Sequence, residues 1–261
     1  MRGNLQAFFK TIIVQMKLSI ARPMFQFVIW VSPFFYATIT YFVYGGQSPE
    51  RIFQYVVLGS GFMGLWTSIV YSSATDINRE RYYGTLENIF VAPVSFAYII
   101  MGKIVGNTIW GFISMLLSFI YLRFVFNLEY PIVEPLLIGL ALLIVVIAIS
   151  VFAFVMALVF TLSKQAEVLM NFIEYPIFLI CGFLFPIAIL PTCLQPLSAI
   201  LPPTWAINLL RVVTNDASTT AQILQAFLIL LATTLIYVGI SVVVYMAVDR
   251  KARMDGKLGV Y

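Results

Sequence analysis

Long apolar runs separated by short polar stretches dominate the chain. A helix needs about 20 apolar residues to cross a hydrocarbon core of ~30 Å. Windows of that kind predict six spans, at residues 24–44, 52–75, 99–126, 135–162, 168–190 and 221–248. We therefore predict an all-α integral membrane protein in which residues 1–261 form a single transmembrane domain.

The first 22 residues have a different pattern. Apolar residues from Leu5 to Ile20 recur at helical spacing, while Gln6, Lys10 and Lys17 fall on the other side. This pattern predicts an amphipathic helix at the interface, with its lysines directed toward headgroup phosphates. A surface helix packed on the protein is the alternative.

Composition supports the membrane assignment. Of the 261 residues, 62% are hydrophobic and 10% are charged, against about 45–50% and ~25% in an average soluble domain. The chain has no histidine, which removes the usual general base and the commonest metal ligand. With no paired deep carboxylates either, we expect no enzyme active site and no metal site.

The two cysteines, Cys181 and Cys193, are too few for a four-thiolate metal site. Their spacing is not that of a C-x-x-C redox pair. Whether they pair with each other stays open at this point.

Basic residues set the expected orientation. If the N-terminus is cytoplasmic, only Arg51, Arg123 and Arg211 of the 15 Lys and Arg residues fall outside. Both termini, including the tail at 249–261, are then expected in the cytoplasm of a multi-pass protein of the inner (cytoplasmic) membrane. The basic residues are scattered along the membrane edge, which argues against a nucleic-acid partner.

Residues 76–94 are the most polar stretch between the first and last spans. We predict two short helical pieces there, with a break at Gly84, an N-cap at Thr85 and an end at Pro93. Leu86, Ile89 and Phe90 would share one face, which suits a groove on a soluble partner. A connector folded against its own bundle is the alternative.

The string R-E-R-x-x-G-T-L-E at residues 79–87, followed by V-A-P-V at 91–94, resembles the cytoplasmic signature of ABC-2-type ABC transporter permeases. The resemblance extends over nearly the whole chain, although the Tyr82-Tyr83 pair among the charges departs from the signature. It implies a coupling helix that docks on the ATP-binding subunit. The implied docking residues are Arg79, Glu80, Arg81, Gly84, Thr85, Leu86, Glu87, Ile89 and Phe90.

The sequence lacks the phosphate-binding motif G-x-x-x-x-G-K-[ST]. The nearest string, Met101-Gly102-Lys103-Ile104, has neither the upstream glycine nor the terminal hydroxyl. We therefore expect no cofactor on this chain, and ATP and Mg²⁺ on a separate ATP-binding cassette subunit.

Prolines and a glycine interrupt the apolar run between Cys181 and Arg211. Such breaks are tolerated at membrane depth only under a cover of protein or beside a water-filled cavity. We predict short re-entrant helices over residues 184–206 at the outer leaflet, or alternatively a loop lying flat on the surface. The resemblance implies an outer gate there, with Gly182, Pro186, Pro191, Pro202 and Trp205.

Small and hydroxyl residues gather in the second span, which permits close helix approach or a polar groove. The deepest acid, Glu174, is either a pathway residue or a carboxylate near the inner headgroups. The candidate pathway residues are Ser60, Thr67, Ser68, Phe34 and Glu174.

The resemblance implies the permease subunit of an ABC exporter, a homodimer joined to two ATP-binding subunits in the lipid bilayer. Its expected substrate is amphipathic or lipid-like, such as a drug, an antibiotic or a peptide, moved outward by alternating access. One alternative is an exporter of a lipid-linked polysaccharide of O-antigen or teichoic-acid type. The other is an ion-gradient-driven secondary transporter, which would need several ionisable residues in line where the spans offer Glu174.

Overall fold

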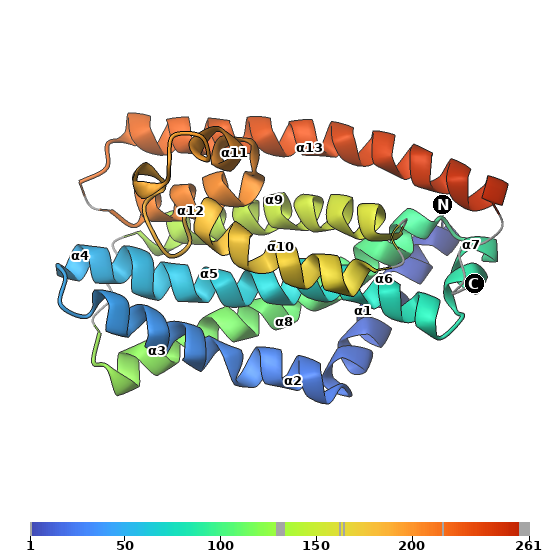
Figure 1. Ribbon diagram of the computed structural model, residues 1–261, viewed down its shortest axis with the longest axis horizontal. Helices are drawn as coiled ribbons and strands as arrows, with labels where there is room; N and C mark the ends of the chain where they lie inside the picture. The colour runs from blue at the N-terminus through green and yellow to red at the C-terminus, as the bar shows by residue number, and fades with distance from the viewer. Residues whose placement is uncertain (1, 129–133, 162, 164, 216, 256–261) are drawn as a thin grey trace.

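A computed structural model describes residues 2–128, 134–161, 163, 165–215 and 217–255. Within these residues the secondary structure is helical and contains no strand, which confirms the predicted all-α class. Long helices run side by side along one axis, and short helices cap both ends of the bundle (Figure 1).

The N-terminal half contains an initial helix, a first span in two pieces, a continuous second span, a short helix and a long helix. The elements are α1 (Arg2–Ile20), α2 (Pro23–Trp30), α3 (Ser32–Tyr44), α4 (Pro49–Arg51), η1 (Ile52–Val57), α5 (Leu58–Trp66), η2 (Thr67–Tyr71), α6 (Ser72–Tyr82), α7 (Leu86–Val91) and α8 (Phe96–Val125). The segments η1 and η2 are π-helical turns inside the second span, so each includes a wider turn than the α-helix around it.

The C-terminal half contains two long helices separated by shorter ones. The elements are α9 (Pro135–Thr161), α10 (Ala166–Ile180), η3 (Ile187–Ile189), α11 (Gln195–Ile200), α12 (Pro202–Val213) and α13 (Thr220–Asp255). The far end of α13 lies at the same end of the bundle as α7, opposite α4 (Figure 1).

Five described helices are long and apolar enough to cross a membrane. They are Pro23–Tyr44, Pro49–Tyr82, Phe96–Val125, Pro135–Thr161 and Thr220–Arg250. The sixth expected span, 168–190, is not one continuous helix. Its helix α10 has 15 residues, which corresponds to about 22 Å, and it stops before Gly182, whose φ of +75° ends the helical path.

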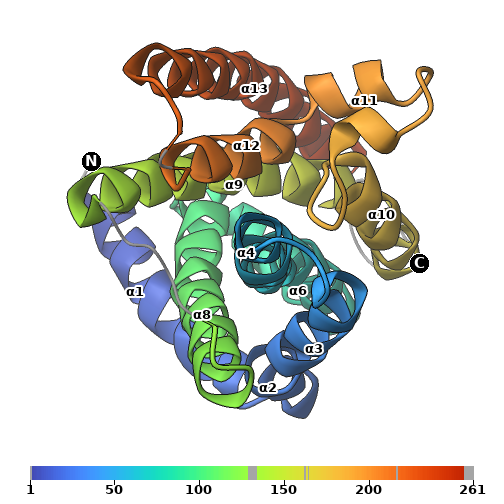
Figure 2. The same cartoon turned by 90° about the vertical axis from the view of Figure 1, so that its left-hand side faces the viewer.

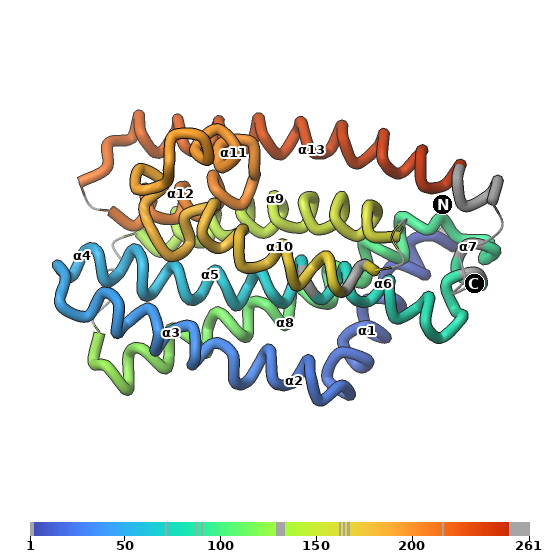
Figure 3. Tube along the Cα trace, in the orientation of Figure 1, coloured from blue at the N-terminus to red at the C-terminus, as the bar shows by residue number. Residues whose placement is uncertain are grey.

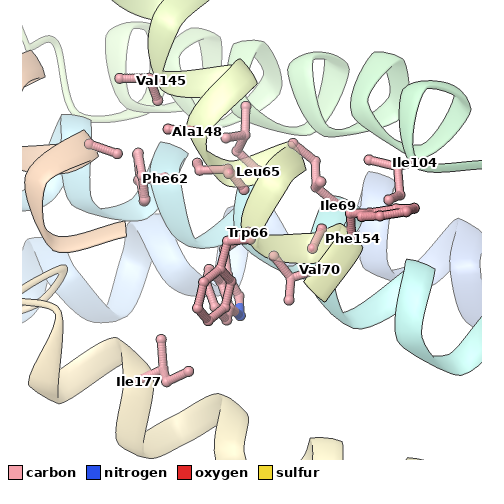
Figure 4. Close-up of a cluster of buried hydrophobic side chains, with 14 of the residues drawn as sticks. Phe62, Leu65, Trp66, Ile69, Val70, Ile104, Val145, Ala148, Phe154 and Ile177 are labelled. Carbon is pink, nitrogen blue, oxygen red and sulfur yellow. The ribbon is translucent and has the colours of Figure 1, made fainter. Parts of the chain in front are cut away.

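The second span forms the centre of the bundle, with α3, α8, α9 and α10 around it (Figure 2). Every residue of α5 is buried. The rings of Phe62 and Phe183 meet at 4.8 Å, and Trp66 packs against Phe152 at 5.5 Å. Figure 4 shows this cluster, to which α9 and α10 also contribute side chains. Aromatic and aliphatic packing therefore fixes the second span from several sides.

Small residues let two neighbours approach the second span closely. A Cβ added to Gly64 would lie 2.6 Å from Ser114 Oγ on α8. A Cβ added to Gly59 would lie 2.5 Å from the backbone oxygen of Phe183. A backbone oxygen has less freedom to move than a side chain. The absence of a side chain at Gly59 therefore permits the segment after α10 to lie directly against the span.

The thiols of Cys181 and Cys193 are both free, the first buried and the second exposed. The pairing left open by the sequence is therefore absent from the structure.

We predict that Gly59→Ala lowers the thermal unfolding midpoint of the purified protein, because the added methyl overpacks against Phe183 at a cost of about 1–3 kcal/mol. The control is Gly139→Ala, where a Cβ meets no atom within 4 Å. Melting curves followed by tryptophan fluorescence measure both. Equal midpoints for the two variants would contradict the assigned role of Gly59.

Candidate functional site

Residues 76–94, the predicted coupling segment, form a turn at one end of the bundle (Figure 3). Its first piece is the end of the second span, since α6 continues that span to Tyr82. Gly84 then adopts a φ of +67°, a conformation that favours glycine, and α7 begins at Leu86. The predicted break at Gly84 is therefore confirmed.

Thr85 occupies the N-cap position of α7, but its side chain makes no capping hydrogen bond. Its hydroxyl instead donates to the Glu80 carboxylate and, at 3.1 Å, to the Glu80 backbone oxygen. The N-cap position predicted for Thr85 is therefore confirmed, while its hydroxyl binds Glu80 on the preceding helix instead of the first turn of α7. This bond closes the turn between α6 and α7.

A buried carboxylate just before the turn joins several helices. Asp76 is fully buried. Its Oδ1 accepts from Arg22 at 2.9 Å and from Arg79 at 2.7 Å. Its Oδ2 accepts from Asn107 Nδ2 at 3.1 Å and from Gln15 Nε2. One side chain of α6 thus binds α1, the α1–α2 junction and α8.

A second layer of hydrogen bonds surrounds that carboxylate. Gln15 Nε2 also lies 3.0 Å from Asn107 Oδ1 and 3.0 Å from Ser19 Oγ. Arg22 donates to Ser19 Oγ at 2.9 Å, and Asn107 Nδ2 donates to Ser73 Oγ at 3.3 Å. We call Gln15, Ser19, Arg22, Ser73, Asp76, Arg79 and Asn107 the Asp76 network.

Arg22 joins this network from the position directly before the first span, Pro23–Tyr44. Burial lowers the pKa of its guanidinium from the ordinary value, and the adjacent Asp76 carboxylate opposes that shift. Two guanidinium groups, from Arg22 and Arg79, therefore compensate one buried negative charge. Buried charges need such pairing, since an uncompensated one is strongly destabilising.

Two glycines bring α1 against α8. A Cβ on Gly102 would lie 2.9 Å from the backbone oxygen of Phe8, and one on Gly106 would lie 3.1 Å from Gln15 Cβ. Such small residues four apart let helices pack closely. Other apolar side chains of α1, including Leu5 and Phe9, are exposed. Helix α1 therefore packs on the protein along one face and leaves an apolar face free for lipid.

The charged residues predicted to meet a partner bind the protein's own helices. Arg79 pairs with Asp76, and Glu80 pairs with Lys103 on α8. Arg81 donates to the backbone oxygens of Thr161 and Ser163 at the end of α9. These charges therefore fasten the segment to α8 and α9 in addition to the bonds of Asp76.

The apolar face predicted for α7 points into the bundle instead of toward a partner. Leu86 is only 1% exposed and belongs to the central core, against which the half-buried Ile89 also packs. The side chains of Glu87 and Phe90 lie outside the described residues. The expectation that Leu86 faces outward is therefore wrong. Its side chain packs in the hydrophobic core at this end of the bundle.

Three large hydrophobic side chains of the turn are exposed. Tyr82 and Tyr83 are 77% and 68% exposed, and their rings meet at 5.6 Å. Val91 is 85% exposed. The surface left for a partner therefore includes the tyrosine pair that departs from the sequence signature.

At the opposite end, the predicted outer segment consists of short helical pieces. Pro186 precedes η3, and Pro202 opens α12. Pro191 lies between η3 and α11, and Trp205 Nε1 donates to the Ala199 backbone oxygen at 2.8 Å. Broken helices over 184–206 are thus observed, and Trp205 joins two of them.

Sequence reasoning missed the groups that hold this outer segment. Arg211 donates to the backbone oxygens of Gly182 at 2.7 Å and Phe183 at 3.2 Å. Its guanidinium also lies over the Tyr55 ring, 4.3 Å from the centroid. Tyr44 donates to the Leu184 oxygen at 2.7 Å. These bonds satisfy backbone oxygens of the non-helical segment that follows α10.

The candidate pathway residues do not form one group. Ser60 Oγ lies 2.8 Å from Ser118 Oγ on α8, and Phe34 packs against Tyr121 with ring centroids 4.9 Å apart. Ser68 is buried with no hydrogen-bond partner.

The remaining two candidates are in contact, since Thr67 Oγ1 donates to Glu174 Oε1 at 2.8 Å. Thr67 lies near the middle of the span Pro49–Tyr82. Glu174 is therefore buried inside the bundle, where it is 7% exposed.

Comparison with protein-family models gives a match over residues 9–243 to a model described as ABC-2 family transporter protein. The matched region includes the coupling segment, the outer segment and most of α13. A search of curated proteins gives no match to this chain.

We predict that Asp76→Asn destabilises the protein by about 3–5 kcal/mol, because it removes the charge that compensates Arg22 and Arg79. Thermal unfolding measures the loss, and limited proteolysis should show faster cleavage near the α1–α2 junction. The matched control is Glu134→Gln at an exposed position. Unchanged unfolding and proteolysis of the Asp76 variant would contradict a central role for the network.

Proposed function

Because this chain belongs to the ABC-2 family of transporter proteins, we propose that it is the membrane-spanning permease subunit of an ATP-driven exporter. The observation that carries the proposal is the turn between α6 and α7. It is fastened to the bundle by charged groups, yet it leaves exposed aromatic side chains at its tip. An element of this kind can receive force from a partner and pass it to the helices.

The proposed partner is a separate ATP-binding cassette subunit that carries ATP and Mg²⁺. The absence of a phosphate-binding loop from the sequence supports this division of labour. We propose that Tyr82, Tyr83 and Val91 contact it, since buried aromatic residues commonly supply much of the binding energy of an interface. Arg79, Glu80 and Arg81 then act as positioning residues that fix the turn.

Displacement of the turn would move several helices together. Helix α6 continues the second span, the Glu80–Lys103 pair reaches α8, and Arg81 reaches the end of α9. Asp76 adds α1. The nucleotide-bound partner must stabilise one arrangement of these helices over another, because only a differential interaction shifts an equilibrium.

The second span connects the turn to the outer segment. Near its outer end, Gly59 lies against the Phe183 oxygen, and Gln54 accepts from Arg211 at 3.3 Å. We therefore assign the outer gate to the segment after α10, whose residues are Gly182, Pro186, Pro191, Pro202 and Trp205. Motion of the second span would open or close this gate.

We further propose a homodimer with both termini in the cytoplasm, which exports an amphipathic or lipid-like compound by alternating access. The excess of basic residues on the predicted cytoplasmic side supports this orientation. Apolar side chains exposed on α2, α3, α10 and α13 offer surfaces for a second protomer and for lipid.

We predict that the double variant Tyr82→Ala/Tyr83→Ala weakens assembly with the ATP-binding subunit about tenfold or more, since each aromatic side chain contributes at least ~1 kcal/mol. The test is co-purification and ATP hydrolysis after co-expression with ATP-binding cassette subunits of the same genome.

The matched control is Phe42→Ala, which removes an aromatic side chain that is 78% exposed on α3. Wild-type assembly and hydrolysis in the double variant would exclude the tyrosine pair as the docking surface. Transport by the purified chain alone, without any ATP-binding subunit, would overturn the proposed function itself.

A further inference from the structure

Glu174 places a carboxylate near the middle of the membrane-spanning bundle. It is the ninth residue of α10, about 12 Å along that helix at 1.5 Å per residue. Its contact, Thr67, lies halfway along the second span. The residue is 7% exposed. Ionisable residues at such depth are costly, so they mark functional sites by default.

The carboxylate has hydrogen-bonding neighbours but no counter-charge among the described residues. Thr67 donates to it at 2.8 Å, and Tyr36 on α3 lies in the same region. Ion pairs within the described residues include those of Arg22 and Arg79 with Asp76, and of Lys103 with Glu80. None of them includes Glu174.

A second buried polar group nearby is unsatisfied. Trp66, the residue before Thr67, is 0% exposed, and its indole Nε1–H has no acceptor. Figure 4 shows the indole directed toward Ile177, one turn beyond Glu174 on α10. Buried donors are almost always paired in folded proteins. The orphan donor of Trp66 and the Glu174 carboxylate, which has no counter-charge, thus come from the residues where the second span meets α10. Together they indicate a ligand with both an acceptor atom and a positive charge.

Aromatic rings border the same region. Tyr36 packs edge-on against Phe178 at 5.9 Å, and Trp66 packs against Phe183 at 6.0 Å. The faces of such rings attract organic cations, and their area binds apolar groups. The backbone beside them is the π-helical turn η2, a type of turn frequently found at functional sites.

We propose that Glu174, Thr67, Tyr36 and Trp66 form a mid-membrane binding site for amphipathic organic cations that carry a protonated amine and a nearby oxygen acceptor. Glu174 binds the ammonium group, and Thr67 orients its carboxylate. The Trp66 N–H donates to the oxygen, while the surrounding rings hold the apolar body. This site deepens the proposed function, on which it rests, by naming the substrate class.

The test compares two ligands that differ in one group. Propranolol has an amine, a hydroxyl and an aromatic body, and its glycol has a hydroxyl in place of the amine. Equilibrium dialysis against the purified full-length chain in nanodiscs, with empty nanodiscs as blank, gives both dissociation constants. The expected result is at least about tenfold tighter binding of propranolol than of the glycol.

The same assay applied to Glu174→Gln should show propranolol binding about tenfold weaker and glycol binding unchanged, because the amide removes the charge but keeps the size. The matched control is Glu50→Gln. It alters an exposed carboxylate at the start of the second span, far from Thr67, that accepts from Gln54 and Asn215. It should bind both ligands as the wild type does.

Thr67→Val provides a second variant in case the amide at Glu174 prevents folding. It should weaken propranolol binding by about threefold, since it removes one hydrogen bond that orients the carboxylate. Thr108→Val, which removes a hydroxyl bound only to its own helix at Ile104 O, is its control.

Equal binding of the two ligands by the wild-type protein, or full propranolol affinity in Glu174→Gln, would overturn the site. Because the assay contains no ATP-binding subunit, those results would leave the proposed permease function standing. Failure of the permease to assemble with any ATP-binding subunit would, conversely, not alter the binding constants.

Discussion

The fold depends most on the compensation of one buried negative charge, that of Asp76. A carboxylate without solvent needs donors and counter-charges, and these come from α1, the α1–α2 junction, α6 and α8. Four segments therefore have to converge at one point. The requirement is strict because breaking a buried pair costs far more than the intact pair contributes. Hydrophobic packing alone would let these helices slide or rotate with much smaller penalties.

The two ends of the bundle are stabilised in different ways. At the end that carries the turn, charged side chains bind one another and bind carbonyls at the end of α9. At the opposite end, Arg211 and Tyr44 bind backbone oxygens of a broken helix. The second span lies between these two polar regions, in a core of packed rings. A rigid central helix with polar attachments at both ends suits the transmission of a displacement over the full thickness of the membrane.

Much of the fold could be predicted from the sequence, because the thickness of the bilayer sets the length of apolar run that a spanning helix needs. The exception, 168–190, had enough apolar residues but contained Gly182, whose positive φ ends the helix. The Asp76 network was not predictable in the same way, since Gln15 and Asn107 are 92 positions apart. The spacing of Gly102 and Gly106 is a local signal of the close contact between α1 and α8. The inward turn of Leu86 depends on tertiary packing, which no local pattern specifies.

The π-helical turn η2 determines which side chains of the second span reach α8. Ser60 and Gly64 before this turn and Ser68 within it face α8 at intervals of four residues. Beyond the turn, the contacts with α8 come from Ser73, Asp76 and Glu80. The interval from Ser68 to Ser73 is five, so η2 absorbs one additional residue. Without it, the helical phase would differ by about 100°, and Asp76 would point away from its partners. A single-residue change in register thus gives one continuous helix both an apolar middle and a correctly aimed charged end.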